Sequence, residues 1–180
     1  MAFGPRRTHL QLPRKRIPAH NTPMDFQAVI PTPFGALGIR CDVQHIDEIR
    51  FLPPGSPDVP AQNALAARAV AQLHDWLQSP RTEFDLPLRA SGTAFQQRVW
   101  QAISGIGIGK VLTYGEIARQ LNSAAQAVGQ ACGANPYPIL VPCHRVVARQ
   151  ALGGFAGHRA GYLIETKQWL LQHEAIHALR

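Results

Sequence analysis

The chain has 180 residues, of which 46% are hydrophobic, and its formal net charge is +7. This length allows one domain or two small ones, and no apolar run approaches the roughly 18 residues of a membrane span. The three cysteines are widely spaced without a CxxC pair, which argues against a disulfide framework and a zinc site. Since the N-terminus also lacks an apolar signal core, we expect a cytoplasmic protein that binds no metal and no membrane.

The charge is unevenly distributed along the chain. Residues 1–23 carry five basic and no acidic side chains, residues 24–91 carry five basic and eight acidic ones, and residues 92–180 carry eight basic and three acidic ones. The first stretch is also rich in proline and shows no apolar period, so we expect a basic disordered arm there. The basic excess of the last stretch suits a polyanion, although ordinary solvated surfaces often show an excess of this size.

Residues 24–91 predict a small α/β domain. A helix is expected at residues 61–78, where Ala, Leu and Val recur at helical spacing. This part of the chain carries no chemical motif, and we place its end near Ser91. Three short runs rich in β-forming residues, separated by Pro and Gly, predict strands at residues 26–30, 37–41 and 46–52.

Residues 92–180 predict a mainly helical domain. Ser/Thr-x-x-Glu/Gln spacings that begin at Thr93, Thr113 and Ser123 predict three capping boxes. The last two open short helices joined by a tight turn, which is the pattern of a helix-turn-helix. A further helix is expected at about residues 162–179.

The second helix of this pair has unusually small side chains. Only Gln126 and Gln130 are long and polar enough to reach base edges in a groove. Such a helix suits close approach to the DNA backbone or the minor groove, and it equally suits tight internal packing.

A cysteine beside a histidine marks the centre of this half. Cys143 and His144 follow the apolar run 139–141, which we expect to be a strand, and precede the turn at Gly153–Gly154. This arrangement predicts either a reactive thiol or a buried structural cysteine, and the hexapeptide that starts at Pro142 does not decide between them.

Longer stretches around this cysteine resemble one known family. The chain reads Thr-Tyr-Gly-Glu-Ile-Ala at 113–118, Asn-Pro-Tyr-Pro-Ile-Leu-Val-Pro-Cys-His-Arg-Val-Val at 135–147, and Lys-Gln-Trp-Leu-Leu-Gln-His-Glu at 167–174. These motifs resemble the O6-alkylguanine-DNA alkyltransferases over roughly residues 93–174. The resemblance implies an α+β fold, in which a small ribonuclease H-like α/β domain precedes a mainly helical domain with a winged-helix-like helix-turn-helix.

The resemblance also implies a reaction. The family transfers an alkyl group from O6-alkylguanine, and from O4-alkylthymine, in double-stranded DNA to its own cysteine after the base has flipped out. Cys143 would be the acceptor, His144 would take its proton through a water, and Glu174 would orient the imidazole. The alkylated cysteine is not regenerated, so a monomer without any cofactor would act once.

The remaining expected site residues follow from the same resemblance. Asn135 would hold the turn before the cysteine, and Tyr114 would contact the rotated phosphate and the guanine edge. We also expect DNA contacts from Gln126, Gln130 and Arg145, and a substrate pocket formed by Cys132, Pro138, Val146, Phe155 and Ala156.

Three positions depart from the family pattern. Gln126 stands where an arginine usually fills the gap left by the flipped base, and Gly133 stands where the residue is often basic. The segment 157–167 is longer than usual by about five residues. It carries His158 and Arg159, which would restore positive charge near the DNA.

Three other functions are weighed against this one. An alkyltransferase-like damage sensor would bind alkylated DNA without repairing it, but such proteins lack the acceptor cysteine. A helix-turn-helix regulator should carry more base-reading side chains than Gln126 and Gln130. A cysteine hydrolase would need an oxyanion hole, which nothing in the sequence suggests.

Overall fold

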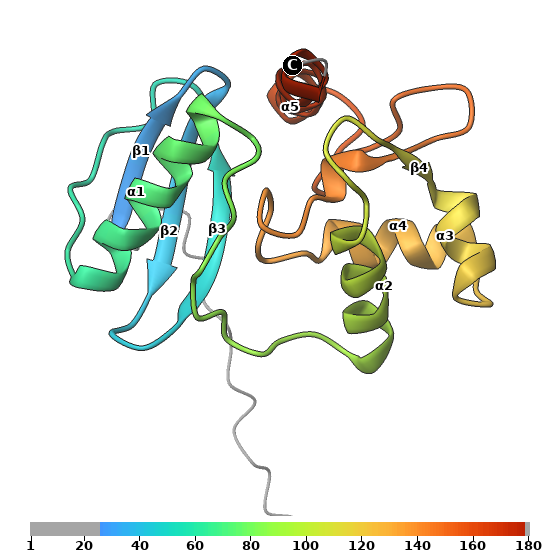
Figure 1. Cartoon of the computed structure of the whole chain (residues 1–180), viewed down its shortest axis with the longest axis horizontal. Helices are drawn as coiled ribbons and strands as arrows, with labels where there is room; N and C mark the ends of the chain where they lie inside the picture. The colour runs from blue at the N-terminus through green and yellow to red at the C-terminus, as the bar shows by residue number, and fades with distance from the viewer. Residues whose placement is uncertain (1–25, 179–180) are drawn as a thin grey trace, which may run out of the picture.

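The computed structural model describes residues 26–178, apart from the side chain of residue 176. A sheet with one helix lies beside a group of mostly short helices (Figure 1). The expected α+β class is therefore present. The expected arm at residues 1–23 falls outside the described residues.

The first part is built on a three-stranded antiparallel sheet in the order β1-β2-β3. We expected a turn to begin at Pro31, but Pro31 and Thr32 continue the first strand and pair with Ala36 and Gly35. Because β1 is an edge strand, it tolerates a proline, which cannot donate to a ladder. The strands are β1 (Ala28–Thr32), β2 (Gly35–Cys41) and β3 (Ile46–Leu52).

Helix α1 (Ala64–Gln78) packs against this sheet (Figure 1). It begins three residues later than the expected residue 61, because Asn63 caps it. The Asn63 side chain accepts a hydrogen bond of 2.8 Å from the N–H of Ala66. Its buried side chains recur at helical spacing, at Leu65, Ala69, Leu73 and Trp76.

The second part begins with α2 (Ala94–Ser104) and contains the two short helices of the expected helix-turn-helix. These helices, α3 (Tyr114–Gln120) and α4 (Ala125–Gly133), pack against each other. A parallel pair of two-residue strands, β4 (Leu112–Thr113) and β5 (Val146–Val147), was not expected, because two residues are too short to show a period.

Two of the three expected capping boxes form, and the third is wrong. Helix α4 begins after Ala124, whose side chain cannot cap, so Ser123 lies one residue too early to act as the N-cap. No capping bond therefore engages Gln126. The two that form are Thr93 with Gln96 before α2, and Thr113 with Glu116 before α3.

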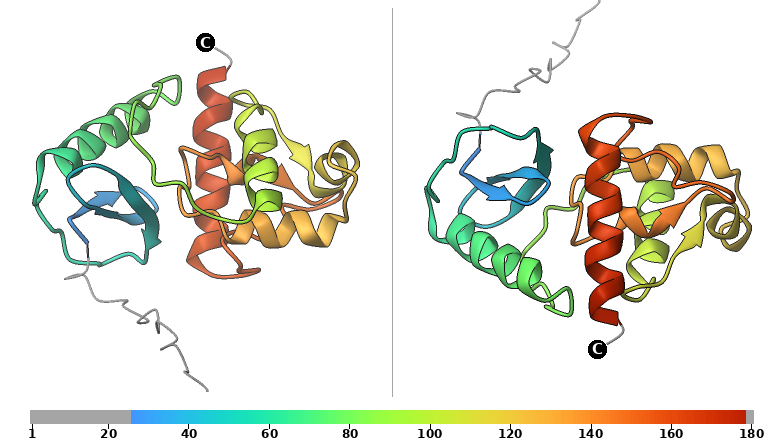
Figure 2. Two further views of the ribbon diagram at one scale, coloured as in Figure 1. Left: turned by 90° about the horizontal axis from the view of Figure 1, so that it is seen from below. Right: turned by 90° about the horizontal axis from the view of Figure 1, so that it is seen from above.

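Helix α5 (Tyr162–Ala178) lies between the two parts (Figure 2). Neither it nor any other described helix is long and apolar enough to cross a membrane. Its aromatic side chains reach the first part: the ring centroids lie 5.0 Å apart between Trp169 and Phe34, and 5.2 Å apart between His173 and Trp76.

One buried apolar cluster runs through both parts of the chain. The expected boundary near Ser91 lies in the extended segment between α1 and α2, where it separates two groups of elements but not two cores. The division into domains at 24–91 and 92–180 stays a prediction.

The capping boxes give a matched test of stability. Thr93→Ala should lower the free energy of unfolding by about 1 kcal/mol, because an N–H at the start of α2 loses its acceptor. Ser123→Ala should leave it unchanged to within about 0.5 kcal/mol, because Ser123 caps nothing. Urea denaturation of both variants measures the difference, and an equal loss in the two would contradict the assignment of the caps.

Candidate active site

Cys143 lies at the start of a short 3-10 helix, η2 (Cys143–Arg145), and is 4% exposed. The run 139–141 before it is not the expected strand but a turn, in which the Val141 N–H bonds to the Tyr137 carbonyl at 2.8 Å. Pro136 and Pro138 explain the difference, since neither has an N–H to donate to a ladder. The thiol is therefore held by a turn and a tight helix.

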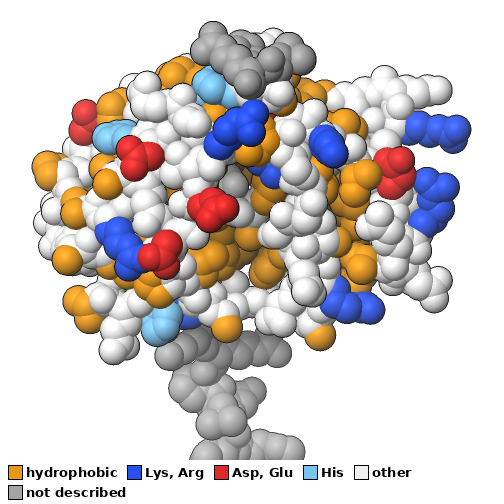
Figure 3. Space-filling model, in the orientation of Figure 1, with side chains coloured by type: hydrophobic (Ala, Val, Ile, Leu, Met, Phe, Trp, Pro, Cys, Tyr) orange, Lys and Arg blue, Asp and Glu red, His pale blue; other side chains and the backbone are white. Residues whose placement is uncertain are grey.

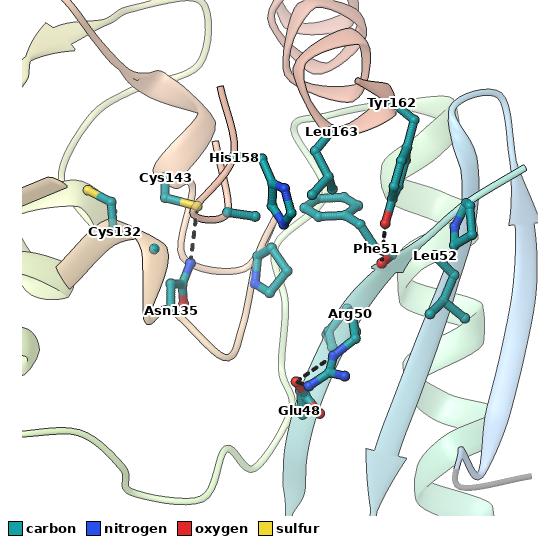
Figure 4. Close-up of a pocket in the computed structure, with 15 residues that line it drawn as sticks. Glu48, Arg50, Phe51, Leu52, Cys132, Asn135, Cys143, His158, Tyr162 and Leu163 are labelled. Carbon is teal, nitrogen blue, oxygen red and sulfur yellow. Dashed lines mark hydrogen bonds and ion pairs between the residues drawn. The ribbon is translucent and has the colours of Figure 1, made fainter. Parts of the chain in front are cut away.

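Asn135 holds this turn, as expected. Its side-chain Nδ2 donates to the Val141 carbonyl at 2.8 Å and to Cys143 Sγ at 3.4 Å (Figure 4). Its Oδ1 accepts a bond of 2.9 Å from the N–H of Tyr137. The bond to sulfur favours the thiolate over the thiol.

Glu174 joins helix α5 to the residues that follow the cysteine. One carboxylate oxygen lies 2.8 Å from His144 Nε2, and the carboxylate also accepts bonds of 2.8–3.1 Å from the guanidinium of Arg145. All three residues are buried. Burial by itself raises the pKa of Glu174, but the bonds from His144 and Arg145 outweigh it and hold the pKa at about 2.

This carboxylate determines which imidazole nitrogen carries the proton. An ionised carboxylate can only accept, so Nε2 of His144 must be the donor, which leaves Nδ1 with a lone pair. Nδ1 is buried and has no hydrogen-bond partner among the described residues. Burial also lowers the pKa of His144, which keeps the ring neutral at neutral pH. His144 therefore offers a base on the side away from Glu174.

The thiol of Cys143 needs such a base. Burial raises its pKa, while the Asn135 bond and the positive charge of Lys167 oppose that rise only in part. A thiol with a raised pKa stays protonated at neutral pH and is a poor nucleophile until its proton is removed.

Lys167 is a site residue that we did not predict. It is fully buried, and its Nζ donates to the carbonyls of Val146, Leu152 and Gly154 at 2.6–3.0 Å. Desolvation lowers its pKa to about 8. Lys167 lies three residues before Leu170 and seven before Glu174, which places it on the buried face of α5. This spacing is the feature of the sequence that could have predicted its burial.

Two cavities reach the thiol. The wide cavity, of about 1130 Å³, opens beside α4 and is lined by Tyr114, Gln126, Gln130 and the loop around Gly153. The narrow cavity, of about 370 Å³, lies between strand β3 and the start of α5. Five residues line both cavities, namely Cys132, Gly133, Cys143, Ala156 and His158.

The structure brings most of the expected pocket residues together. Phe155 lines the wide cavity, Pro138 lines the narrow one, and Ala156 and Cys132 line both. Burial raises the pKa of the Cys132 thiol to about 12, so Cys132 serves as an uncharged wall. Val146 lines neither of these cavities, and its carbonyl accepts the bond from Lys167, so its expected contact with guanine stays a prediction.

Of the residues expected to contact DNA, Tyr114 lines the wide cavity, whereas Arg145 is buried. The hydroxyl of Tyr114 donates to the Gly154 carbonyl at 3.0 Å, and burial raises its pKa to about 12. Arg145 is buried, and its Nη1 donates to the Ile106 carbonyl while its Nε and Nη2 donate to Glu174. This placement argues against the expected contact between Arg145 and DNA.

The surface of residues 92–180 carries fewer positive charges than their composition suggests. Along the right edge of Figure 3, where Figure 1 shows helix α3, most charged side chains are Lys or Arg. Two of the basic residues of this half, Arg145 and Lys167, are buried, so they contribute little to the surface. Arg159 is exposed and, like Gln126, lines the wide cavity.

A buried cysteine, a positioned neutral imidazole and an open cavity are the parts that a protein with a thiol nucleophile requires. Residues 94–176 match the family described as 6-O-methylguanine DNA methyltransferase, DNA binding domain. The methylated-DNA–protein-cysteine methyltransferase of Salmonella typhimurium is 37% identical over 164 residues, which cover 81% of this chain and 92% of the relative. The chain belongs to the methylated-DNA–protein-cysteine methyltransferase family.

Solved structures agree with this assignment. Mycobacterium tuberculosis OGT in complex with DNA has a TM-score of 0.68 and 38% identity, with 83% of this chain and 92% of that chain covered. The O6-methylguanine methyltransferase of the same organism has a TM-score of 0.65 and 37% identity over the same shares of the two chains.

The buried carboxylate predicts a pH-dependent stability. Glu174→Gln should lower the free energy of unfolding by about 3–5 kcal/mol at pH 7, because the Arg145 charge stays buried without its partner. The folded pKa of about 2 lies below the unfolded value of about 4.3, so the stabilisation is complete above pH 4.3 and is lost as the pH falls through about 2.

Urea denaturation over a pH series measures this effect. The difference between wild type and Glu174→Gln should shrink as the pH falls from about 4.3 to about 2. The exposed Glu165 on the same helix provides the matched control Glu165→Gln, which should leave stability unchanged. A loss in Glu174→Gln that is equal at neutral and acid pH would contradict the assignment.

Proposed function

We propose that this chain repairs DNA directly by moving the alkyl group of O6-alkylguanine to Cys143. The observation that carries the proposal is the imidazole of His144, the residue next to the buried Cys143: burial keeps it neutral, Glu174 holds its proton on Nε2, and Nδ1 is left unpaired. Membership of the family and the structure of a relative with DNA support the same activity. The chain is thus a methylated-DNA–protein-cysteine S-methyltransferase.

The proposed reaction is a displacement at the alkyl carbon, with the sulfur of Cys143 as nucleophile and guanine as leaving group. His144 Nδ1 takes the Cys143 proton through a water, and the sulfur then bonds to the alkyl carbon. The bond between that carbon and O6 breaks, its electron pair stays with guanine, and guanine takes up the proton that the His144 imidazolium releases through the same water. Glu174 stabilises the imidazolium that forms in between. The thioether is not reversed, so each molecule acts once and uses no cofactor.

The lesion has to leave the helix before the thiol can reach it. In this proposal α3 and α4 act as the helix-turn-helix of a winged-helix-like unit, while the sheet and α1 form the ribonuclease H-like part. The wide cavity receives the flipped base, with Tyr114 at its wall and Phe155 and Ala156 at its inner end. Gln126 and Gln130 on α4 face the DNA, and the exposed Arg159 adds positive charge beside them.

Further parts of the proposal rest on the family resemblance. The chain acts as a monomer on double-stranded DNA in the cytoplasm, and O4-alkylthymine is a second substrate. A damage sensor would need no acceptor thiol, and a helix-turn-helix regulator would need neither Cys143 nor the His144–Glu174 pair. A hydrolase would need an oxyanion hole, which nothing in the sequence suggests. These functions are therefore less well supported.

Intact-protein mass spectrometry tests the reaction. After incubation with a duplex that contains O6-methylguanine, the protein should gain one methyl group on Cys143. The Cys143→Ala variant should gain none, because the acceptor sulfur has been removed. Tight binding with an unchanged mass would replace the proposal with the damage sensor.

The rate of transfer tests the role of Gln126. Gln126→Ala should slow transfer from duplex DNA roughly tenfold, because nothing then fills the gap left by the flipped base. Transfer from the same lesion in single-stranded DNA should be unchanged, since that base is already unpaired. Quenched-flow rates for the two substrates measure this. Equal slowing on both would place Gln126 in the chemistry instead of in base flipping.

A further inference from the structure

Residues 135–142 form the active-site turn, which is attached to the first part of the chain at two points. The N–H of Ile49 on β3 donates to the Pro136 carbonyl at 2.8 Å. The hydroxyl of Tyr137 donates at 2.5 Å to the carbonyl of Arg89, which lies in the segment between α1 and α2. Neither contact takes part in the transfer chemistry proposed above.

Tyr137 links the second attachment to the polar groups inside the turn. Its ring is buried, and its hydroxyl also lies 3.3 Å from the Ile46 carbonyl at the start of β3. Its N–H donates to Asn135 Oδ1 at 2.9 Å, and its carbonyl accepts a bond of 2.8 Å from the N–H of Val141. One residue thus connects the sheet and the segment before α2 with the side chain of Asn135.

The active-site turn does not keep its shape by local preference alone. Ile139 is buried and has a φ of 74°, in the left-handed region that a β-branched residue rarely adopts. A residue in such a conformation persists only where the surrounding structure over-determines it. Contacts from outside the turn are therefore needed, and the bonds of Ile49 and Tyr137 supply them.

Asn135 passes the position of this turn on to the thiol. The N–H of Tyr137 fixes Oδ1 of the amide, and Nδ2 of the same planar group donates to Cys143 Sγ at 3.4 Å (Figure 4). An amide that is held at one oxygen has less freedom to turn its nitrogen away from the sulfur. Because the bond to sulfur stabilises the thiolate, a turn that is held less firmly favours the protonated thiol.

We propose that Tyr137 is a positioning residue for alkyl transfer, which ties the active-site turn to the first part of the chain and keeps Asn135 directed at the Cys143 sulfur. This proposal rests on alkyl transfer to Cys143. Tyr137 lines neither of the two cavities and acts through Asn135. The first part of the chain, which carries no chemical motif, then contributes to the reaction by supplying the carbonyl acceptors for the Tyr137 hydroxyl.

The pH dependence of single-turnover methyl transfer by the full chain tests this role. Tyr137→Phe keeps the buried ring and removes the hydroxyl. It should slow transfer at neutral pH about fivefold, the effect of one ordinary hydrogen bond, because less of Cys143 is then thiolate. The difference from wild type should shrink at alkaline pH, where the thiol ionises without help from Asn135. The other titratable groups around the thiol are the same in both proteins, namely Tyr114, Cys132, His144 and Lys167.

Thr93→Ala is the matched control, because it also removes one hydrogen bond but does so at the start of α2. It should leave the pH profile of transfer unchanged. Titration of the Cys143 thiolate by its ultraviolet absorbance, with Cys143→Ala as the blank, is a second measurement that needs no DNA. Tyr137→Phe should raise the pKa of this thiol, and Thr93→Ala should not.

The outcomes separate this proposal from the one on which it rests. Slowing by Tyr137→Phe that is equal at every pH, or an unchanged thiolate titration, would make Tyr137 a purely structural residue and overturn the proposal. A shift of the same size in Thr93→Ala would do so as well. If wild type transfers no methyl group, alkyl transfer fails as the function, and the thiolate titration alone then decides whether Tyr137 positions Asn135.

Discussion

The site depends on one buried carboxylate that binds two partners. Glu174 accepts hydrogen bonds from His144 and Arg145 at a place where none of the three is open to solvent. Burying the charges of Glu174 and Arg145 is costly unless they are paired, and here they form an ion pair. The same contacts fasten α5 to the 3-10 helix that carries Cys143. Helix α5 also packs between the two parts of the chain (Figure 2). The contacts of Glu174 therefore fix both the orientation of the His144 imidazole and the position of the helix beside it.

Burial acts on the site in two directions. It raises the pKa of Cys143, which protects the thiol, and it lowers the pKa of His144, which keeps the base free. Asn135 and Lys167 then favour the thiolate once the proton has moved. Lys167 also holds the carbonyls of the loop that borders the wide cavity. The thiol is thus protonated and unreactive at rest, while Asn135 and Lys167, which stabilise the thiolate, lie close to it.

Local sequence patterns predicted the helices well where a capping residue or an apolar period determines where a helix lies. The spacing of Thr113 and Glu116 marked the start of α3, and the apolar period marked α1. The same rule failed at Ser123, because its hydroxyl lies one residue too early for α4. Family resemblance supplied Cys143, His144 and Glu174, but not their bonds. Arg145 and Lys167 show why the bonds could not be predicted. A basic residue in a sequence is expected to lie on the surface, and only the tertiary packing shows that these two are buried and hydrogen-bonded.

The central claim is that burial keeps His144 neutral while Glu174 holds its proton on Nε2. Nitrogen NMR of the protein labelled with ¹⁵N-histidine, assigned by comparison with a His144→Gln variant, tests this most directly. The account predicts a protonated Nε2 and an unprotonated Nδ1 at neutral pH, with no titration of this ring until the pH falls below the ordinary histidine range. A proton on Nδ1, or a charged imidazolium at neutral pH, would contradict it.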